Sequence, residues 1–91
     1  MGHRIELEEI EKVLNNVAGV THVCCAYDEK HNKVVGFYTG QVDKVQIIES
    51  MKQSVPDYMV PNVLKQMDRL PLTKNGKTDR KTLLSDYLEG R

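Results

Sequence analysis

The chain has 91 residues, of which 40% are hydrophobic and 29% are charged, and its 13 basic and 13 acidic side chains leave no net charge. These values are typical of one small globular domain rather than a disordered chain, and zero net charge argues against a nucleic-acid partner. No apolar run approaches the roughly 18 residues of a membrane span and no secretory leader is recognisable, so we expect a cytoplasmic protein without a membrane partner.

The first half of the sequence predicts a helix followed by a β-hairpin. Residues 5–17 place apolar side chains at helical spacing from Ile10 onward, acidic residues crowd their start, and Gly19 is placed to end the helix. Residues 20–27 and 33–39 are rich in strand-forming side chains, and the polar segment between them indicates a turn. We therefore expect these two strands to pair in an antiparallel manner.

The second half predicts a helix, a third strand and a last helix. Asp43 and Gln46 resemble a capping box that opens a helix to about Ser54. The residues of that helix expected to face inward are Val45, Ile47, Ile48 and Met51. A third strand is expected near residues 63–67, and Asp79 is placed to cap the last helix. The apolar stripe of the last helix is expected to be Leu83, Leu84, Tyr87 and Leu88.

The predicted order is therefore helix, strand, strand, helix, strand, helix. A small three-stranded sheet with about three helices packed against it buries the apolar side of every element, so the fold class is predicted to be α+β. Residues 1–91 contain no repeat, low-complexity segment or internal linker. We expect them to form a single domain.

The cysteines and histidines do not indicate a metal site. Cys24 and Cys25 are adjacent, and neighbours in a strand point to opposite faces, so a disulfide between them is not expected. We expect both to be small buried residues of a protein in a reducing compartment. The three histidines, His3, His22 and His31, share no zinc-ligand spacing with the cysteines.

Residues 70–81, LPLTKNGKTDRK, carry the strongest local signal for chemistry. Asn75 and Gly76 favour a tight turn because both tolerate positive φ, and Lys77 is expected at its tip. A lysine there is placed to bring one positive charge to an anion. By pattern alone, a solvated turn lysine remains the alternative. The nearby basic residues do not indicate nucleic-acid binding, because acidic residues interrupt them and none of the five aromatic residues is near.

Three segments in order resemble the C-terminal subdomain of adenylate-forming enzymes. They are GHRIELEEIE at 2–11, VPDYMVP at 55–61 and NGKTDR at 75–80, and the resemblance covers essentially the whole chain. It is strongest to the adenylation domains of nonribosomal peptide synthetases and to D-alanine:carrier-protein ligases. Glu8 stands where many family members have glycine, which puts close approach of the backbone to pantetheine in doubt there and favours the D-alanine ligase branch.

The resemblance implies an ATP-dependent ligase that activates an amino acid or another carboxylic acid as an acyl-adenylate. The acyl group then passes to the phosphopantetheine thiol of a carrier protein. ATP, Mg²⁺ and the acid would bind mainly to a large N-terminal domain that these 91 residues lack. The small C-terminal subdomain would be mobile and would take a different orientation for each half-reaction. We accordingly expect residues 1–91 alone to have no turnover.

The resemblance also assigns roles to residues. Lys77 would be catalytic in adenylation, and Asn75 and Gly76 would shape its loop. The residues assigned to the pantetheine tunnel or to contact with the large domain are Gly2, His3, Arg4 and Glu8. A solvated surface charge remains the alternative for Arg4. We predict structural roles for Asp79 as a helix cap and for Arg80 as an exposed or docking charge.

The segment at 55–61 is expected to be structural, with Tyr58 and Met59 packed between helix and sheet. Two alternatives to the amino-acid ligase stay open. One is a non-enzymatic module that only docks a carrier protein, although such a module has no need of Lys77. The other is a ligase for a fatty or aryl acid, although the second and third motifs favour amino acids. The sequence does not distinguish a stand-alone ligase from a multidomain synthetase.

Overall fold

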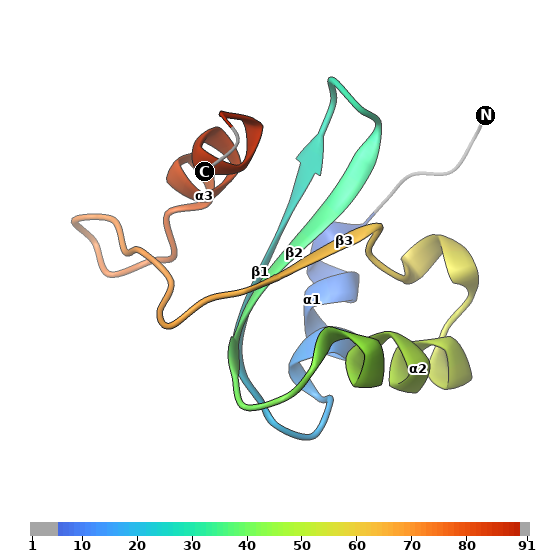
Figure 1. Cartoon of the computed structure of the whole chain (residues 1–91). Coiled ribbons are helices and arrows are strands. Elements are labelled where there is room, and N and C mark those ends of the chain that lie inside the picture. The colour runs from blue at the N-terminus through green and yellow to red at the C-terminus, as the bar shows by residue number, and fades with distance from the viewer. Residues whose placement is uncertain (1–5, 90–91) are drawn as a thin grey trace.

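The structure is a computed structural model that describes residues 6–89, and these residues form three α-helices, one short 3-10 helix and three strands (Figure 1). The elements are α1 (Leu7–Asn15), β1 (Val20–Asp28), β2 (Lys33–Gly40), α2 (Lys44–Ser54), η1 (Asp57–Met59), β3 (Val63–Gln66) and α3 (Arg80–Leu88). The predicted α+β class and the predicted order of helices and strands are confirmed. None of the helices within this range is long and apolar enough to cross a bilayer.

The strands form one mixed sheet in the order β1-β2-β3. β1 and β2 pair in an antiparallel manner, as predicted, with Cys25 opposite Gly36 and Asp28 opposite Lys33. β3 lies parallel to β2, with Val63 opposite Val35. The parallel pairing follows from α2, which carries the chain from the end of β2 back to the start of β3.

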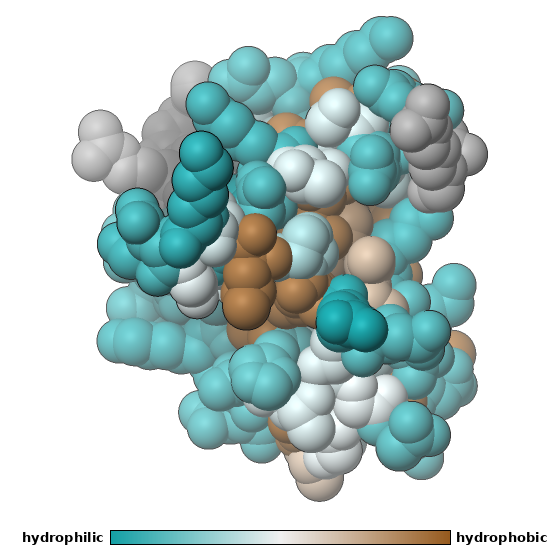
Figure 2. All heavy atoms as spheres, turned by 90° about the vertical axis from the view of Figure 1, so that its left-hand side faces the viewer, coloured by the Kyte–Doolittle hydropathy of each residue, from teal (hydrophilic) through white to brown (hydrophobic). Residues whose placement is uncertain are grey.

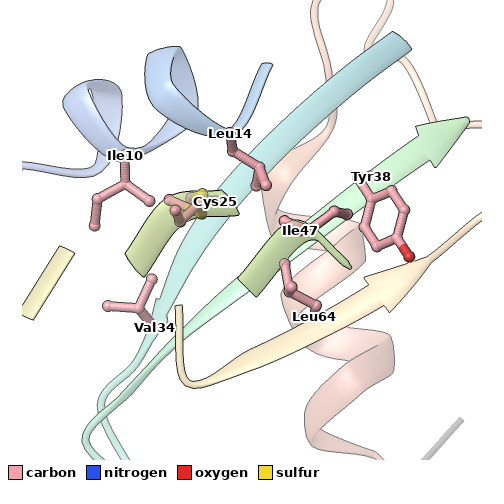
Figure 3. Close-up of a cluster of buried hydrophobic side chains, with 8 residues drawn as sticks. Ile10, Leu14, Cys25, Val34, Tyr38, Ile47 and Leu64 are labelled. Atoms are coloured by element: carbon pink, nitrogen blue, oxygen red, sulfur yellow. The ribbon is translucent and has the colours of Figure 1, made fainter. Parts of the chain in front are cut away.

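The helices cover both faces of the sheet. α1 and α2 lie on one face and α3 lies on the other (Figure 1). The first core cluster, between the sheet and α1 with α2, consists of Ile10, Leu14, Cys25, Val34, Tyr38, Ile47, Met51 and Leu64 (Figure 3). The second, between the sheet and α3, consists of Cys24, Ala26, Val35, Phe37 and Leu83. The fold is therefore three-layered, with neighbouring residues of β1 and β2 contributing to different cores.

The two cysteines illustrate this alternation. Cys25 packs in the first cluster and Cys24 in the second, and both are buried free thiols, as predicted. Burial, helped by the negative charge of Glu11, raises the pKa of the Cys25 thiol to about 12. Burial also raises the pKa of Cys24, against the lowering effect of Arg80. Both thiols are therefore protonated at neutral pH and unreactive.

This burial predicts slow chemical modification. At pH 8 a thiol with a pKa of about 12 is ionised in about one molecule in 10⁴, and the surrounding core excludes reagent. We expect both cysteines to react with a thiol-specific reagent only when the chain unfolds, so that the native rate rises steeply with urea. Rapid modification of one thiol per chain in native buffer would contradict the buried position of that cysteine.

Two details of α2 differ from the prediction. Val45 is 54% exposed rather than inward-facing, whereas Ile47 and Met51 are fully buried. Residues two apart on a helix point in nearly opposite directions, so Val45 cannot share the face of Ile47. Asp43 occupies the N-cap position, but its side chain makes no capping hydrogen bond, so the expected capping box does not form.

Smaller differences concern ends and exposure. The first helix ends at Asn15, before Val17 and Gly19, and β3 ends one residue earlier than expected, at Gln66. Met59 packs against the first cluster as predicted, but Tyr58 is 56% exposed because η1 turns the segment along the surface. Along α3, Leu83 is buried and its apolar neighbours are partly buried, whereas Leu88 lies in the last turn and is 44% exposed.

Candidate functional site

The segment that carries Lys77 forms a short hairpin over residues 71–79. The Thr73 amide donates to the Lys77 carbonyl at 2.7 Å, and the Gly76 amide donates to the Thr73 carbonyl at 3.0 Å. Further from the turn, Leu72 pairs with Thr78 in an antiparallel bridge, and Asp79 N–H donates to the carbonyl of residue 71 at 2.8 Å. These bonds define a three-residue turn, residues 74–76, between two short arms.

Gly76 satisfies the backbone requirement of this turn. A three-residue hairpin loop places its third residue in the left-handed region, and Gly76 has φ +85°. A Cβ at this position would meet nothing within 4 Å, so the demand for glycine comes from φ and not from space. Within the described part of the chain, Asn32 is the one non-glycine residue with positive φ. Asn75 therefore lies in the loop without the positive φ that the sequence predicts for it.

Lys77 lies on the returning arm of the hairpin and not at its tip. The tip is formed by residues 74–76, because Lys77 closes the loop opposite Thr73. The Lys77 side chain is exposed, as expected, and makes no hydrogen bond or ion pair with any residue between 6 and 89. Its backbone is held more firmly, since the Thr73 hydroxyl accepts hydrogen bonds from the amides of Lys77 and Asn75, both at 3.3 Å.

The two faces of the hairpin differ in chemistry. Side chains alternate along the arms, so Thr73 and Lys77 share one face, and Leu72 and Thr78 share the other. The second face borders an open groove of about 820 Å³, whose far wall is the end of the β1–β2 pair around Gly40. Figure 2 shows the side of the molecule on which α3 and the hairpin lie, and hydrophobic residues gather near its centre among hydrophilic ones.

The hairpin continues directly into α3, whose start is well capped. Asp79 accepts from the Thr82 amide at 3.1 Å and from the Thr82 hydroxyl at 2.8 Å, which confirms its predicted role as a cap. Leu83, one turn further along α3, is buried in the second core cluster. The arm that carries Lys77 is therefore two residues from a rigid, anchored helix start.

Arg80 was expected to be an exposed or docking charge, and the structure pairs it within the chain. It is half-exposed, and its guanidinium donates to Glu11 Oε2 at 3.0 Å. The same carboxylate oxygen accepts the Cys25 amide of β1 at 2.7 Å. No local pattern predicts this contact, because its two partners are 69 positions apart and each lies in a different motif.

The structure brings part of the opening segment beside the Lys77 arm. Glu8 is exposed on α1 and borders, together with Thr78, a groove of about 450 Å³ along the edge of β1. The other predicted residues of that segment, Gly2, His3 and Arg4, lie outside the described residues. The outer face of α1 and the returning arm of the hairpin thus form one continuous surface, although they are far apart in the sequence.

Residues 9–77 match the family model of the AMP-binding enzyme C-terminal domain, which covers most of the chain. The chain belongs to this family. Among its relatives, the chain is 42% identical over 87 residues to gramicidin S synthase 2 of Brevibacillus brevis and 37% identical over 87 residues to surfactin synthase subunit 3 of Bacillus subtilis. The matches cover 90% of this chain but only 2% and 7% of those synthases.

Solved structures of larger proteins contain the same fold. Klebsiella oxytoca NpsA, in complex with 3-hydroxyanthranilyl-AMSN, superposes with a TM-score of 0.86 at 27% identity, over 96% of this chain and 18% of NpsA. The four-domain nonribosomal peptide synthetase AB3403, bound to AMP and glycine, superposes with a TM-score of 0.76 at 37% identity, over 88% of this chain and 6% of that synthetase. The C-terminal domain described here is therefore a small part of the proteins that it resembles.

Proposed function

We propose that these residues are the mobile C-terminal subdomain of a longer adenylate-forming ligase, of the kind found in nonribosomal peptide synthetases. The enzyme would activate an amino acid with ATP and transfer the aminoacyl group to the phosphopantetheine thiol of a carrier protein. The observation that carries the proposal is the exposed Lys77 side chain, which has no partner among residues 6–89, on a hairpin whose backbone is fixed. A lysine that only stabilised the fold would be expected to contact it.

The chemistry of adenylation needs such a cation. A carboxylate oxygen of the amino acid attacks the α-phosphorus of ATP, the bond to the β-phosphate oxygen breaks, and pyrophosphate leaves. Two anions must approach each other, and negative charge remains on the phosphate oxygens in the transition state. The Lys77 ammonium, placed between the carboxylate and the α-phosphate, would offset this repulsion and hold the reacting atoms in line.

The substrates themselves would bind mainly outside this domain. The described residues contain no group of three or more His, Cys, Asp or Glu side chains suited to a metal ion, so we assign Mg²⁺ to the large N-terminal domain together with ATP and the acid. In this assignment the small domain contributes one charge and the surface around it. Turnover by residues 1–91 alone is accordingly not expected.

The second half-reaction would use the surface beside the hairpin. We assign Glu8, with Gly2, His3 and Arg4 of the opening segment, to the route of the phosphopantetheine thiol or to contact with the large domain. The exposure of Glu8 on α1 supports this assignment. The named relatives favour a peptide synthetase, and a D-alanine:carrier-protein ligase remains a prediction from Glu8 alone.

The test is amino-acid-dependent exchange of pyrophosphate into ATP by the full-length enzyme that contains these residues. A panel of the common amino acids, D-alanine, a fatty acid and an aryl acid identifies the class of substrate. Exchange with an amino acid supports the proposal, and exchange only with a fatty or aryl acid moves the enzyme to another branch. No exchange with any acid, together with binding of a carrier protein, would instead support the docking-module alternative.

Replacement of Thr73 is expected to lower the exchange rate by a small factor. Replacing it with valine removes the hydroxyl that accepts from the Lys77 and Asn75 amides and leaves a side chain of the same shape. We expect the exchange rate to fall about 2–10-fold, because two long hydrogen bonds to the backbone of the hairpin are lost. Thr73→Ser keeps the hydroxyl and should stay near the unmodified rate. Equal rates for the valine and serine variants would show that the hydroxyl does not position Lys77.

A further inference from the structure

We propose that Glu11 and Arg80 form a clamp that positions the Lys77 hairpin for adenylation. This inference rests on the proposed function, because it assigns positioning residues to the same reaction. The clamp is the pair Glu11–Arg80 together with the Cys25 amide that Glu11 also binds. It joins three separate elements, α1, β1 and the start of α3.

The clamp lies at an open edge of the sheet. β1 is an edge strand, and the Cys25 N–H points away from β2. No further strand lies on that side, so the sheet itself offers this N–H no acceptor. Glu11 Oε2 accepts this N–H at 2.7 Å and the Arg80 guanidinium at 3.0 Å. The Glu11 side chain is 21% exposed, so the carboxylate is partly shielded from water. One oxygen thereby ties the helix start on one face of the sheet to α1 on the other.

The clamp matters for the hairpin because the hairpin itself makes few contacts with the rest of the domain. Every side chain from Leu72 to Lys77 is exposed, and Leu72 itself is 64% exposed. The hairpin is held to the body of the domain at its two ends. On the outgoing side, Leu70 packs against the second core cluster. On the returning side, Asp79 caps α3, and Arg80, three positions after Lys77, is the first residue whose side chain bonds α1.

The chemistry of the pair suits a fixed position rather than a switch. Interactions with Cys24 and then Glu11 hold the pKa of Arg80 above its ordinary value, so its charge persists at every working pH. A guanidinium presents its donors in a rigid planar fork, which sets direction as well as distance. An error of about 1 Å at a catalytic group can cost on the order of 10² in rate, so a weak surface pair can still matter for catalysis.

The experiment measures pyrophosphate exchange by the full-length enzyme with Glu11→Gln. Glutamine keeps an oxygen to accept the Cys25 amide but loses the charge that holds Arg80. We expect kcat to fall about 10-fold with little change in KM for ATP, because the large domain binds the nucleotide. Arg80→Gln should give the same loss, and Arg80→Lys, which keeps the charge but not the planar fork, should give a smaller loss. Glu49→Gln on α2 and Lys81→Gln on α3 are exposed controls with the same charge changes.

The same substitutions in a Lys77→Ala background separate positioning from general stability. If Glu11 acts through Lys77, Glu11→Gln should add almost nothing to the loss that Lys77→Ala already causes. An equal 10-fold loss in both backgrounds would overturn the clamp and make the pair merely structural, and so would no loss in the enzyme that retains Lys77. Absence of exchange by the unmodified enzyme would instead overturn the proposed function, and the clamp with it.

Discussion

Replacing Lys77 with alanine is expected to lower amino-acid-dependent pyrophosphate exchange by the full-length enzyme about 10²–10³-fold, the effect of removing one preorganised group that stabilises charge in a transition state. The ammonium is not committed to any partner among residues 6–89, so its removal should leave the fold intact. The loss should therefore appear in kcat, with the urea midpoint of the domain unchanged.

Lys74 provides a matched control within the same hairpin. It is also an exposed lysine, but it lies at the tip of the turn rather than on the returning arm. Lys74→Ala should keep an exchange rate close to that of the unmodified enzyme. Lys77→Ala with an unchanged rate and an unchanged midpoint would make Lys77 a solvated surface residue, as its local pattern alone allowed, and would favour the docking module.

Gly40→Ala is expected to produce the largest loss of stability, about 2–6 kcal/mol in the free energy of unfolding, from backbone strain together with overpacking. Gly40 ends β2 with φ +129°, and a Cβ there would overlap the carbonyl oxygen of Gly19. Backbone at this corner cannot shift easily, since Gly40 pairs with Val20 next to an irregularity in the β1–β2 register. Urea unfolding of the 91-residue chain, followed by circular dichroism, measures the change.

Gly76→Ala separates strain from overlap. Gly76 has φ +85°, but the space around its Cβ position is open. We expect it to cost only about 1–2 kcal/mol, the penalty for an L-residue in the left-handed region. If the two alanine variants lost equal stability, the overlap with Gly19 would not be the cause of the greater effect at Gly40.

Local patterns predicted most of the elements because their signals lie within a few residues. The alternation that sends Cys24 and Cys25 to opposite cores is a property of any strand, and Asp79 caps α3 through a bond to Thr82, three positions away. Local patterns were wrong in α2, where more apolar residues are present than can face the sheet. Val45 and Ile47 are both apolar, and only the position of the sheet determines which one faces it.

Some features of the candidate site could also be predicted from local sequence, and others could not. The turn around Gly76 and the exposure of Lys77 follow from adjacent residues and could be predicted from the sequence. The place of Lys77 on the returning arm could not, because it depends on which backbone groups pair across the loop. Its assignment to catalysis came from three motifs in order, and the match to residues 9–77 confirms the family while the role of the lysine stays a prediction.

The sequence by itself determined the α+β class, the order of the elements and the family, because composition, periodicity and short motifs depend on residues that are close together in the chain. Only the tertiary structure decided that β3 runs parallel to β2, that Gly40 passes against Gly19, and that Glu11 meets Arg80 across the edge of β1. Each of these contacts joins residues at least 21 positions apart. Such contacts depend on how whole elements pack, and one sequence carries no local signal for them.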